Sequence, residues 1–92
     1  MDQSRPIDAL NNARNKSVIV ELKNQRRYVG KLVAFDIHIN TVLNDAEEYI
    51  EEYKEEEVNG KMIRVKTGNL VLKRKLGTVF IRGDTITIVS PQ

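Results

Sequence analysis

Two short polar segments of this 92-residue chain, residues 36–40 and 82–84, carry side chains suited to contact with a nucleobase. The planar imidazole of His38 and the planar guanidinium of Arg82 can stack on a base, an interaction worth about 1–3 kcal/mol per base. The amide of Asn40 offers both a donor and an acceptor, as the Watson–Crick edge of uracil requires. A carboxylate at Asp36 could hold that amide in one rotamer. These residue types predict a site that grips a base and favours uracil.

Each of these residues also has a purely structural explanation. Asp36 and Asn40 could cap turns by bonding backbone amides, which is the commoner use of Asx residues in loops. Arg82 could form an exposed ion pair with Asp84, and His38 could be an ordinary loop residue. The chain has one histidine and no cysteine, so a metal site of several imidazoles or thiolates is excluded. The sequence leaves both explanations open and predicts neither a metal nor another cofactor.

The elements that must position these loops are one helix and five strands. Apolar residues recur at helical spacing over about residues 4–14, where Ser4 suits the N-cap and Pro6 the first turn. From Ser17 onward the apolar period is two, which predicts extended segments at residues 17–22, 28–36, 41 to about 53, 62–66 with 69–81 as one strand in two parts, and 85–90.

Glycines mark the expected turns and bends of this sheet. Asn59-Gly60 predicts a tight hairpin turn, and Arg82-Gly83-Asp84 predicts a second one. Gly30 lies inside a strand, where it predicts a bend or a close backbone approach. Thr67-Gly68 and Gly77 are places where the long fourth strand could kink or bulge.

The composition narrows the class of protein. With 40% hydrophobic and 30% charged residues, residues 1–92 are expected to form one globular domain. No apolar run approaches the roughly 20 residues that span a bilayer, and the N-terminus lacks the order of a secretory signal, so a cytoplasmic protein is expected. An enzyme is disfavoured, because the chain has no cysteine, no second histidine and no phosphate-cradling glycine loop.

Charge is distributed unevenly along the chain. Eight of the thirteen acids lie between Asp45 and Glu57, whereas the rest of the chain has fourteen bases and five acids. That basic remainder would favour a polyanion as partner. A small core and a sheet with two open edges would both gain from pairing with neighbouring chains, so an oligomer is expected.

Two motifs together resemble those of the archaeal Sm-like (LSm) RNA-binding family. The segments Val18–Leu22, Gly30–Leu32 and Phe35–Asn40 with Leu43 look like the first Sm motif, and Val79–Asp84 with Ile86 and Val89 looks like the second. The resemblance covers about four fifths of the chain. It implies a mainly β fold: a short N-terminal helix and a strongly bent five-stranded antiparallel sheet, an SH3-like small barrel.

The resemblance also implies an assembly and a ligand. The fourth strand would pair with the fifth strand of the next identical subunit, giving a ring, usually of seven, that binds single-stranded uridine-rich RNA at its central pore. The residues matching the family's uridine pocket are His38, Asn40 and Arg82, with Asp36, Gly83 and Asp84 in the same two loops. A second RNA contact on the helix face of the ring would use Arg5 and Phe35.

The resemblance is weaker between about residues 46 and 74, where archaeal Sm-like proteins usually have a short loop and this chain is expected to have an extended acidic hairpin. Such an acidic run is commonly a solvated face, yet around a ring it could guide RNA toward the pore or pair one ring with another. The bases Lys73-Arg74-Lys75 could contact phosphate or neutralise glutamates opposite them.

Two functions from different classes follow. The first is a ring-forming RNA chaperone or scaffold of RNA processing, in which repetition of one weak pocket gives avidity for a short uridine run. The second is a small-barrel protein-interaction module that recruits peptides to its strand edges and is indifferent to RNA.

Overall fold

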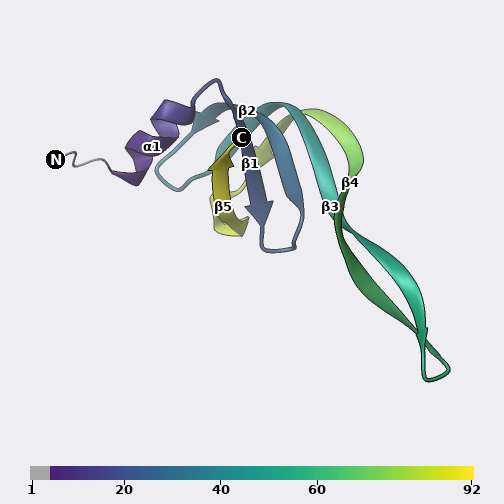
Figure 1. Ribbon diagram of the computed structural model, residues 1–92. Helices are drawn as coiled ribbons and strands as arrows, with labels where there is room; N and C mark the ends of the chain where they lie inside the picture. Colours follow the sequence, from purple (N-terminus) through teal and green to yellow (C-terminus); the bar gives the residue numbers. More distant parts are fainter. Residues whose placement is uncertain (1–4) are drawn as a thin grey trace.

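The computed structural model describes residues 5–92 and confirms a mainly β fold with one N-terminal helix. The elements are α1 (Pro6–Ala13), β1 (Ser17–Leu22), β2 (Arg27–Phe35), β3 (Thr41–Val58), β4 (Lys61–Ile81), a 3-10 turn η1 (Gly83–Thr85) and β5 (Ile86–Pro91). The strands form one antiparallel sheet in the order β4-β3-β2-β1-β5. The sheet bends strongly, with α1 beside one end and the β3–β4 hairpin extending far beyond the other (Figure 1).

The helix begins close to where the sequence predicts. Ser4, the expected N-cap, lies outside the described residues; Arg5 occupies the N-cap position, and its backbone N–H donates to the Asp8 carboxylate at 3.0 Å. Pro6 stands in the first turn, where its missing N–H costs nothing. Ala13 is the buried residue of the helix and joins the core of the sheet.

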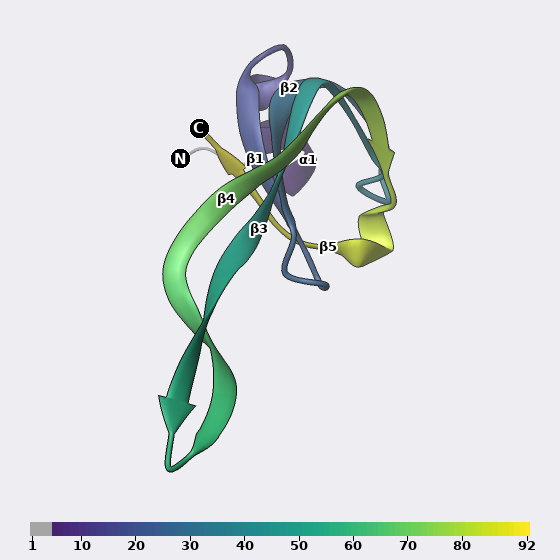
Figure 2. The same cartoon turned by 90° about the vertical axis from the view of Figure 1, so that its right-hand side faces the viewer.

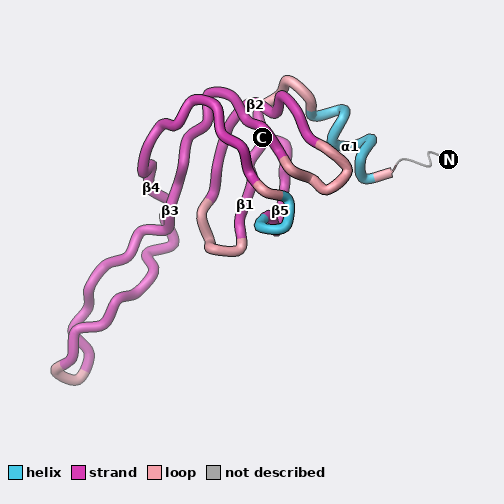
Figure 3. Tube along the Cα trace, turned by 180° about the vertical axis from the view of Figure 1, so that it is seen from behind, coloured by secondary structure: helices cyan, strands magenta, loops and turns pink. Residues whose placement is uncertain are grey.

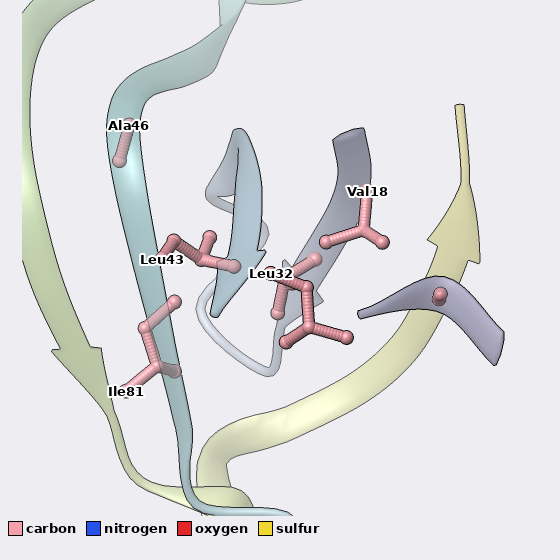
Figure 4. Close-up of a cluster of buried hydrophobic side chains, with 7 residues drawn as sticks. Val18, Leu32, Leu43, Ala46 and Ile81 are labelled. Atoms are coloured by element: carbon pink, nitrogen blue, oxygen red, sulfur yellow. The ribbon is translucent and has the colours of Figure 1, made fainter. Parts of the chain in front are cut away.

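The core lies on the concave side of the bent sheet. Strand alternation sends Val18 and Val20 of β1 to the same face as Leu32 of β2, and all three are fully buried. Figure 4 shows Leu43 and Ile81 reaching from β3 and β4 toward Leu32. Burial of these side chains is the main source of stability that a chain without disulfides has available.

Gly30 marks the close backbone approach that the sequence predicts. A Cβ at this position would lie 3.0 Å from the carbonyl oxygen of Asn44 and 3.2 Å from the Cα of Ala46. The pairing of β2 with β3 shifts register between Val29 and Lys31. Any larger side chain at residue 30 would push β2 away from β3.

The long hairpin corrects two expectations. β3 continues to Val58, five residues beyond the expected end, and β4 runs without interruption from Lys61 to Ile81, where two parts of one strand were expected. The glycines do not break β4, because Gly68 and Gly77 adopt positive φ values (86° and 74°) and register shifts next to them absorb the extra residues. Pairing with β3 on both sides of each shift keeps the strand continuous.

The tip of the hairpin follows its sequence closely. Asn59 and Gly60 both have positive φ (52° and 77°), as the two central residues of a type I′ turn require. Figure 2 shows the two strands twisting around each other as they leave the sheet, and Figure 3 shows α1 and the hairpin tip at opposite ends of the molecule. The second expected turn, at residues 82–84, forms a 3-10 turn over Gly83–Thr85, so β5 begins at Ile86.

Candidate nucleic-acid interface

The loop between β2 and β3 is closed by the Asp36 carboxylate. Its Oδ1 accepts the backbone N–H groups of His38 at 2.8 Å and of Asn40 at 3.1 Å. The backbone N–H of Asp36 in turn donates to the Asn40 carbonyl oxygen at 3.2 Å. Ile39 takes a positive φ of 63°, which turns the chain back toward β3. The structural explanation for Asp36 is therefore correct: it holds a tight five-residue loop.

The side chain of Asn40 links this loop to the one after β4. Its Nδ2 donates to Asp36 Oδ2 at 3.0 Å, and its Oδ1 accepts the backbone N–H of Gly83 at 2.8 Å. The backbone N–H can only donate and the carboxylate can only accept, so these two partners fix which end of the amide is oxygen. One amide N–H and one oxygen lone pair remain free for a ligand.

Gly83 allows the two loops to touch. A Cβ at Gly83 would overlap the carbonyl oxygen of His38 and would lie 2.8 Å from the carbonyl carbon of Ile39. Only a residue without a side chain fits between the loops. Beyond the pairing of Thr41 with Ile81, the two loops thus come into direct backbone contact between residues 38–39 and residue 83.

Arg82 and Asp84 flank Gly83 and form an ion pair. The guanidinium Nη2 lies 2.8 Å from Asp84 Oδ2, and the two side chains are 81% and 62% exposed. The expected exposed ion pair is therefore present, and an exposed pair contributes little stability. The hydroxyl of Thr85 donates to the Arg82 carbonyl oxygen at 2.6 Å, which fixes the backbone from which the guanidinium extends.

These side chains surround one open pocket of about 440 Å³. It is lined by the residues that the sequence places in the two loops: His38, Asn40, Arg82, Gly83 and Asp84. Asp36 is not part of this lining but accepts a hydrogen bond from Asn40, which is. The structure thus brings together all six residues expected at the principal site, with His38 and Arg82 exposed to solvent.

Asp36 stays ionised across the ordinary pH range. The hydrogen bond from the Asn40 amide holds the pKa of Asp36 below its usual value, and the two backbone N–H donors add to this effect. An ionised carboxylate is an acceptor only, so the Asn40 N–H must point at it. The orientation of the Asn40 amide is therefore coupled to the charge of Asp36.

The two residues expected at a second contact are not joined in the structure. Phe35 is half-buried, and the guanidinium carbon of Arg14 lies 5.4 Å from the centre of its ring, within cation–π range. Arg5 pairs with Asp8 at 3.4 Å. The sequence offers no sign of Arg14, because only the packing of the segment after α1 places it over the ring.

A buried carboxylate at the base of the hairpin was also missed. Glu48 is fully buried; its Oε1 accepts from Arg74 Nε at 3.0 Å, and its Oε2 lies 3.5 Å from Arg26 Nη1 and accepts the Tyr28 hydroxyl. Burial raises the pKa of Glu48, but the hydrogen bonds and the two guanidinium charges outweigh it and lower the pKa overall. Burial and the adjacent carboxylate raise the pKa of Tyr28, so its hydroxyl remains a donor. We call Arg26, Tyr28, Glu48 and Arg74 the Glu48 cluster.

Two other kinds of site are not found in the described part of the chain. Within residues 5–92, no three His, Cys, Asp or Glu side chains are grouped so that they could hold a metal ion. No helix in the same range is long and apolar enough to cross a membrane.

The chain is similar in sequence to a known protein family over nearly its full length. The LSM domain family model matches residues 8–91. An snRNP Sm-like protein of Methanococcoides burtonii is 43% identical over 88 residues, which cover 96% of this chain and 97% of the relative.

Two solved structures share the fold. The Pyrococcus abyssii Sm protein, determined in complex with a uridine heptamer, aligns with a TM-score of 0.70 and 30% identity and covers 97% of this chain and 100% of its own. The P. aerophilum SmAP1 heptamer aligns with a TM-score of 0.69 and 26% identity, over 99% and 97% of the two chains. With a family match over nearly its full length and two Sm motifs in order, the chain belongs to the LSM domain family.

Proposed function

We propose that residues 1–92 form a single Sm-like domain that assembles into a ring and binds single-stranded uridine-rich RNA at its pore. Its role would be that of an RNA chaperone or a scaffold in RNA processing, by binding and without catalysis. The observation that carries this proposal is the Asn40 amide, fixed between Asp36 and Gly83 at the edge of a pocket shared with His38 and Arg82. A cytoplasmic location stays a prediction from the sequence.

The free groups of Asn40 match uracil. Uracil offers N3–H as a donor and O4 as an acceptor, so it can bond both the free lone pair of Oδ1 and the free hydrogen of Nδ2. Cytosine has the opposite polarity at these two positions and cannot form both bonds. His38 and Arg82 supply planar groups on which the base can stack. Because Asp36 keeps the amide from rotating, the preference for uracil would be built into the loop before RNA arrives.

The ends of the sheet support a ring. In the chain by itself, β4 and β5 are the two outer strands, so each has one unpaired backbone edge. Pairing β4 of one copy with β5 of the next would remove both edges and bring the residue 36–40 and 82–84 loops of all copies around one opening. The P. aerophilum relative is a heptamer, and we propose the same number of identical subunits here.

The proposal includes the second RNA contact on the helix face of the ring, with Arg14 added to Arg5 and Phe35. Phe35 would offer a half-buried aromatic face, with Arg14, the C-cap of α1, over its ring and Arg5 at the N-cap of the same helix. A base could insert beside Phe35 and its phosphate could reach either arginine. Phe35→Ala would then weaken binding of long RNAs more than binding of a short uridine oligomer.

The test is binding of a fluorescent uridine oligomer at fixed salt. His38→Ala and Arg82→Ala should each weaken binding about 5- to 150-fold, because a stacked base contributes about 1–3 kcal/mol. Arg64→Ala is the matched control: Arg64 also lies over an aromatic ring, Tyr53, at 4.8 Å, but far along the hairpin. Unchanged affinity in both pocket variants would contradict the assigned site, and indifference of the wild-type protein to RNA would favour the protein-interaction module.

A further inference from the structure

The two outer strands of the sheet each carry one large apolar side chain that the fold leaves uncovered. Phe80 of β4 is 82% exposed, and Ile88 of β5 is 50% exposed. Within residues 5–92, the other exposed large apolar side chains lie at Ile37 or on the hairpin at residues 53–72. One exposed apolar residue by itself needs no explanation, whereas one on each open edge of a sheet marks both edges as candidates for pairing.

Both side chains point to the outer face of the sheet. Ile81 is buried in the core and Val79 packs against it, so Phe80 between them points outward. On β5, Val89 packs against the core and pairing with β1 is regular from residue 88 to residue 91, so Ile88 points outward as well. When two strands pair, side chains of the same face meet. Phe80 and Ile88 would therefore meet where β4 of one copy adjoins β5 of the next.

We propose that Phe80 packs against Ile88 of the next copy of this chain, and that this contact sets the register of each seam, the antiparallel pairing of β4 with the next copy's β5. The inference rests on the proposed ring and names the side chains that align its subunits. Every pair of neighbouring strands within the sheet is antiparallel, and the seam would continue that pattern. Residues directly opposite each other have Cβ atoms about 4.5–5.5 Å apart, which is close enough for a phenyl ring to contact a branched side chain.

The residue types match at the centre of this seam. The pairs would be Ile81–Thr87, Phe80–Ile88, Val79–Val89, Thr78–Ser90 and Gly77–Pro91. Two apolar pairs lie together, one on each face, and two hydroxyl side chains follow on the outer face. Pro91, which has no N–H to donate, would meet Gly77, where β4 already has a positive φ of 74° and an adjacent register shift.

Other registers lose this match. A shift of one residue would turn Phe80 to the face of β5 that carries Val89, which packs against the core. A shift of two residues would set Phe80 opposite Ser90 in one direction and opposite Ile86, which also packs against the core, in the other. The proposed register is the one that buries both exposed apolar side chains against each other.

The register also decides how neighbouring RNA pockets are spaced. With Phe80 opposite Ile88, Arg82 would lie opposite Ile86 of the next copy, directly after that copy's Gly83–Thr85 turn. The pocket of one copy and the turn of the next would therefore adjoin at the end of each seam. A slide of two residues would change this spacing by about 7 Å, at about 3.3–3.4 Å per residue.

Disulfide cross-linking tests the register, because the chain has no cysteine of its own. Oxidised F80C/I88C should give a ladder of linked chains in a denaturing gel, since a disulfide forms between Cβ atoms up to about 4.5 Å apart. F80C/S90C, in which the second cysteine is two residues away on the same face, is the matched control and should link far less. Equal or stronger linking in F80C/S90C would overturn the register, and so would a bond between residues 80 and 88 of one chain.

A charged pair provides a test that does not depend on disulfide geometry. F80E/I88K sets opposite charges across each seam and should assemble, whereas F80K/I88K sets like charges there and should stay dissociated in analytical ultracentrifugation. Both side chains are exposed in the single chain, so neither variant alters its core, which circular dichroism would verify. Equal assembly of the two variants would overturn the contact.

Truncation of the ring of Phe80 measures the strength of the contact. Phe80→Ala should raise the dissociation constant of each seam about 10- to 150-fold, the loss expected when a buried phenylalanine side chain is removed. Met62→Ala is the matched control, because Met62 is also exposed (62%) but lies near the tip of the hairpin. An unchanged dissociation constant in Phe80→Ala would overturn the proposal.

Oligouridine binding by the wild type separates this inference from the proposed function. Rings that link through residues 80 and 88 but ignore oligouridine would remove the RNA site and keep the seam. Rings that bind oligouridine but link preferentially in F80C/S90C would keep the RNA site and remove the proposed register. A wild-type chain that stays monomeric would overturn both the ring and its seam.

Discussion

Replacing Gly83 with alanine tests whether contact between the two loops makes the pocket. The new Cβ would overlap the carbonyl oxygen of His38 and come within 2.8 Å of the Ile39 carbonyl carbon. Both are backbone atoms, which cannot rotate away as the end of a flexible side chain can. The loops must therefore separate, and the 2.8 Å bond from the Gly83 N–H to Asn40 Oδ1 must lengthen or break.

The cost can be worked out from these contacts. Loss of one hydrogen bond costs about 0.5–1.5 kcal/mol, and forcing an extra methyl group into a closed contact costs about 1–3 kcal/mol. We therefore expect Gly83→Ala to lower the free energy of unfolding by about 2–4 kcal/mol. If separation of the loops also removes one hydrogen bond between the pocket and the base, worth about 1 kcal/mol, the affinity per site falls about fivefold. Repetition of the site in a ring would multiply that loss.

Urea denaturation and anisotropy with a labelled uridine oligomer measure the two effects. Gly60→Ala is the control, because a Cβ at Gly60 would meet no atom within 4 Å; Gly60, unlike Gly83, has a positive φ (77°). It should cost about 1 kcal/mol through backbone strain alone and leave RNA affinity unchanged. If Gly83→Ala kept both wild-type stability and wild-type affinity, the close loop contact would not exist in solution.

Three further predictions concern Asn40, Asp36 and Glu48. Asn40→Asp should reduce the preference for oligouridine over oligocytidine, measured by competition, because the donor to uracil O4 is lost and the new carboxylate faces Asp36. Hydrogen bonding lowers the pKa of Asp36 below its ordinary value of 3.8. The ionised carboxylate therefore stabilises the fold above about pH 3.8, and this contribution is lost as the pH falls through the lower pKa of the folded state. In urea denaturation, the free energy of unfolding of the wild type should approach that of Asp36→Asn in that pH range. Glu48→Ala should lower the free energy of unfolding by about 2–3 kcal/mol in the same assay, because Arg26, Arg74 and Tyr28 lose a buried charged acceptor. An unchanged urea midpoint would show that the Glu48 cluster does not contribute to stability.

Much of the fold was predictable because its signals are local. Alternation from Ser17 gave β1 with its observed bounds, and Asn59-Gly60 placed the hairpin turn at the correct residues. The pocket was predictable for a different reason. The segments that contain His38, Asn40 and Arg82 resemble the two Sm motifs. The two loops adjoin the paired ends of β3 and β4, where Thr41 lies opposite Ile81.

The features that the sequence did not reveal depend on distant packing. Glu48 stands in an acidic run that resembles a solvated surface, and only its spacing of two from buried Ala46 hinted that it faces inward. Arg14 follows a helix with no visible relation to Phe35, which it covers. β4 looked divided at Gly68 because local propensity cannot report that β3 pairs on both sides of the glycine.

Native mass spectrometry of the full chain, with and without a uridine oligomer, tests the ring and its pocket together. We predict an assembly built from seven-membered rings that takes up the oligomer, and a His38→Ala/Arg82→Ala variant that keeps the rings but loses this uptake. A protein that remains monomeric in this measurement and binds no oligouridine would contradict both the ring and the pocket.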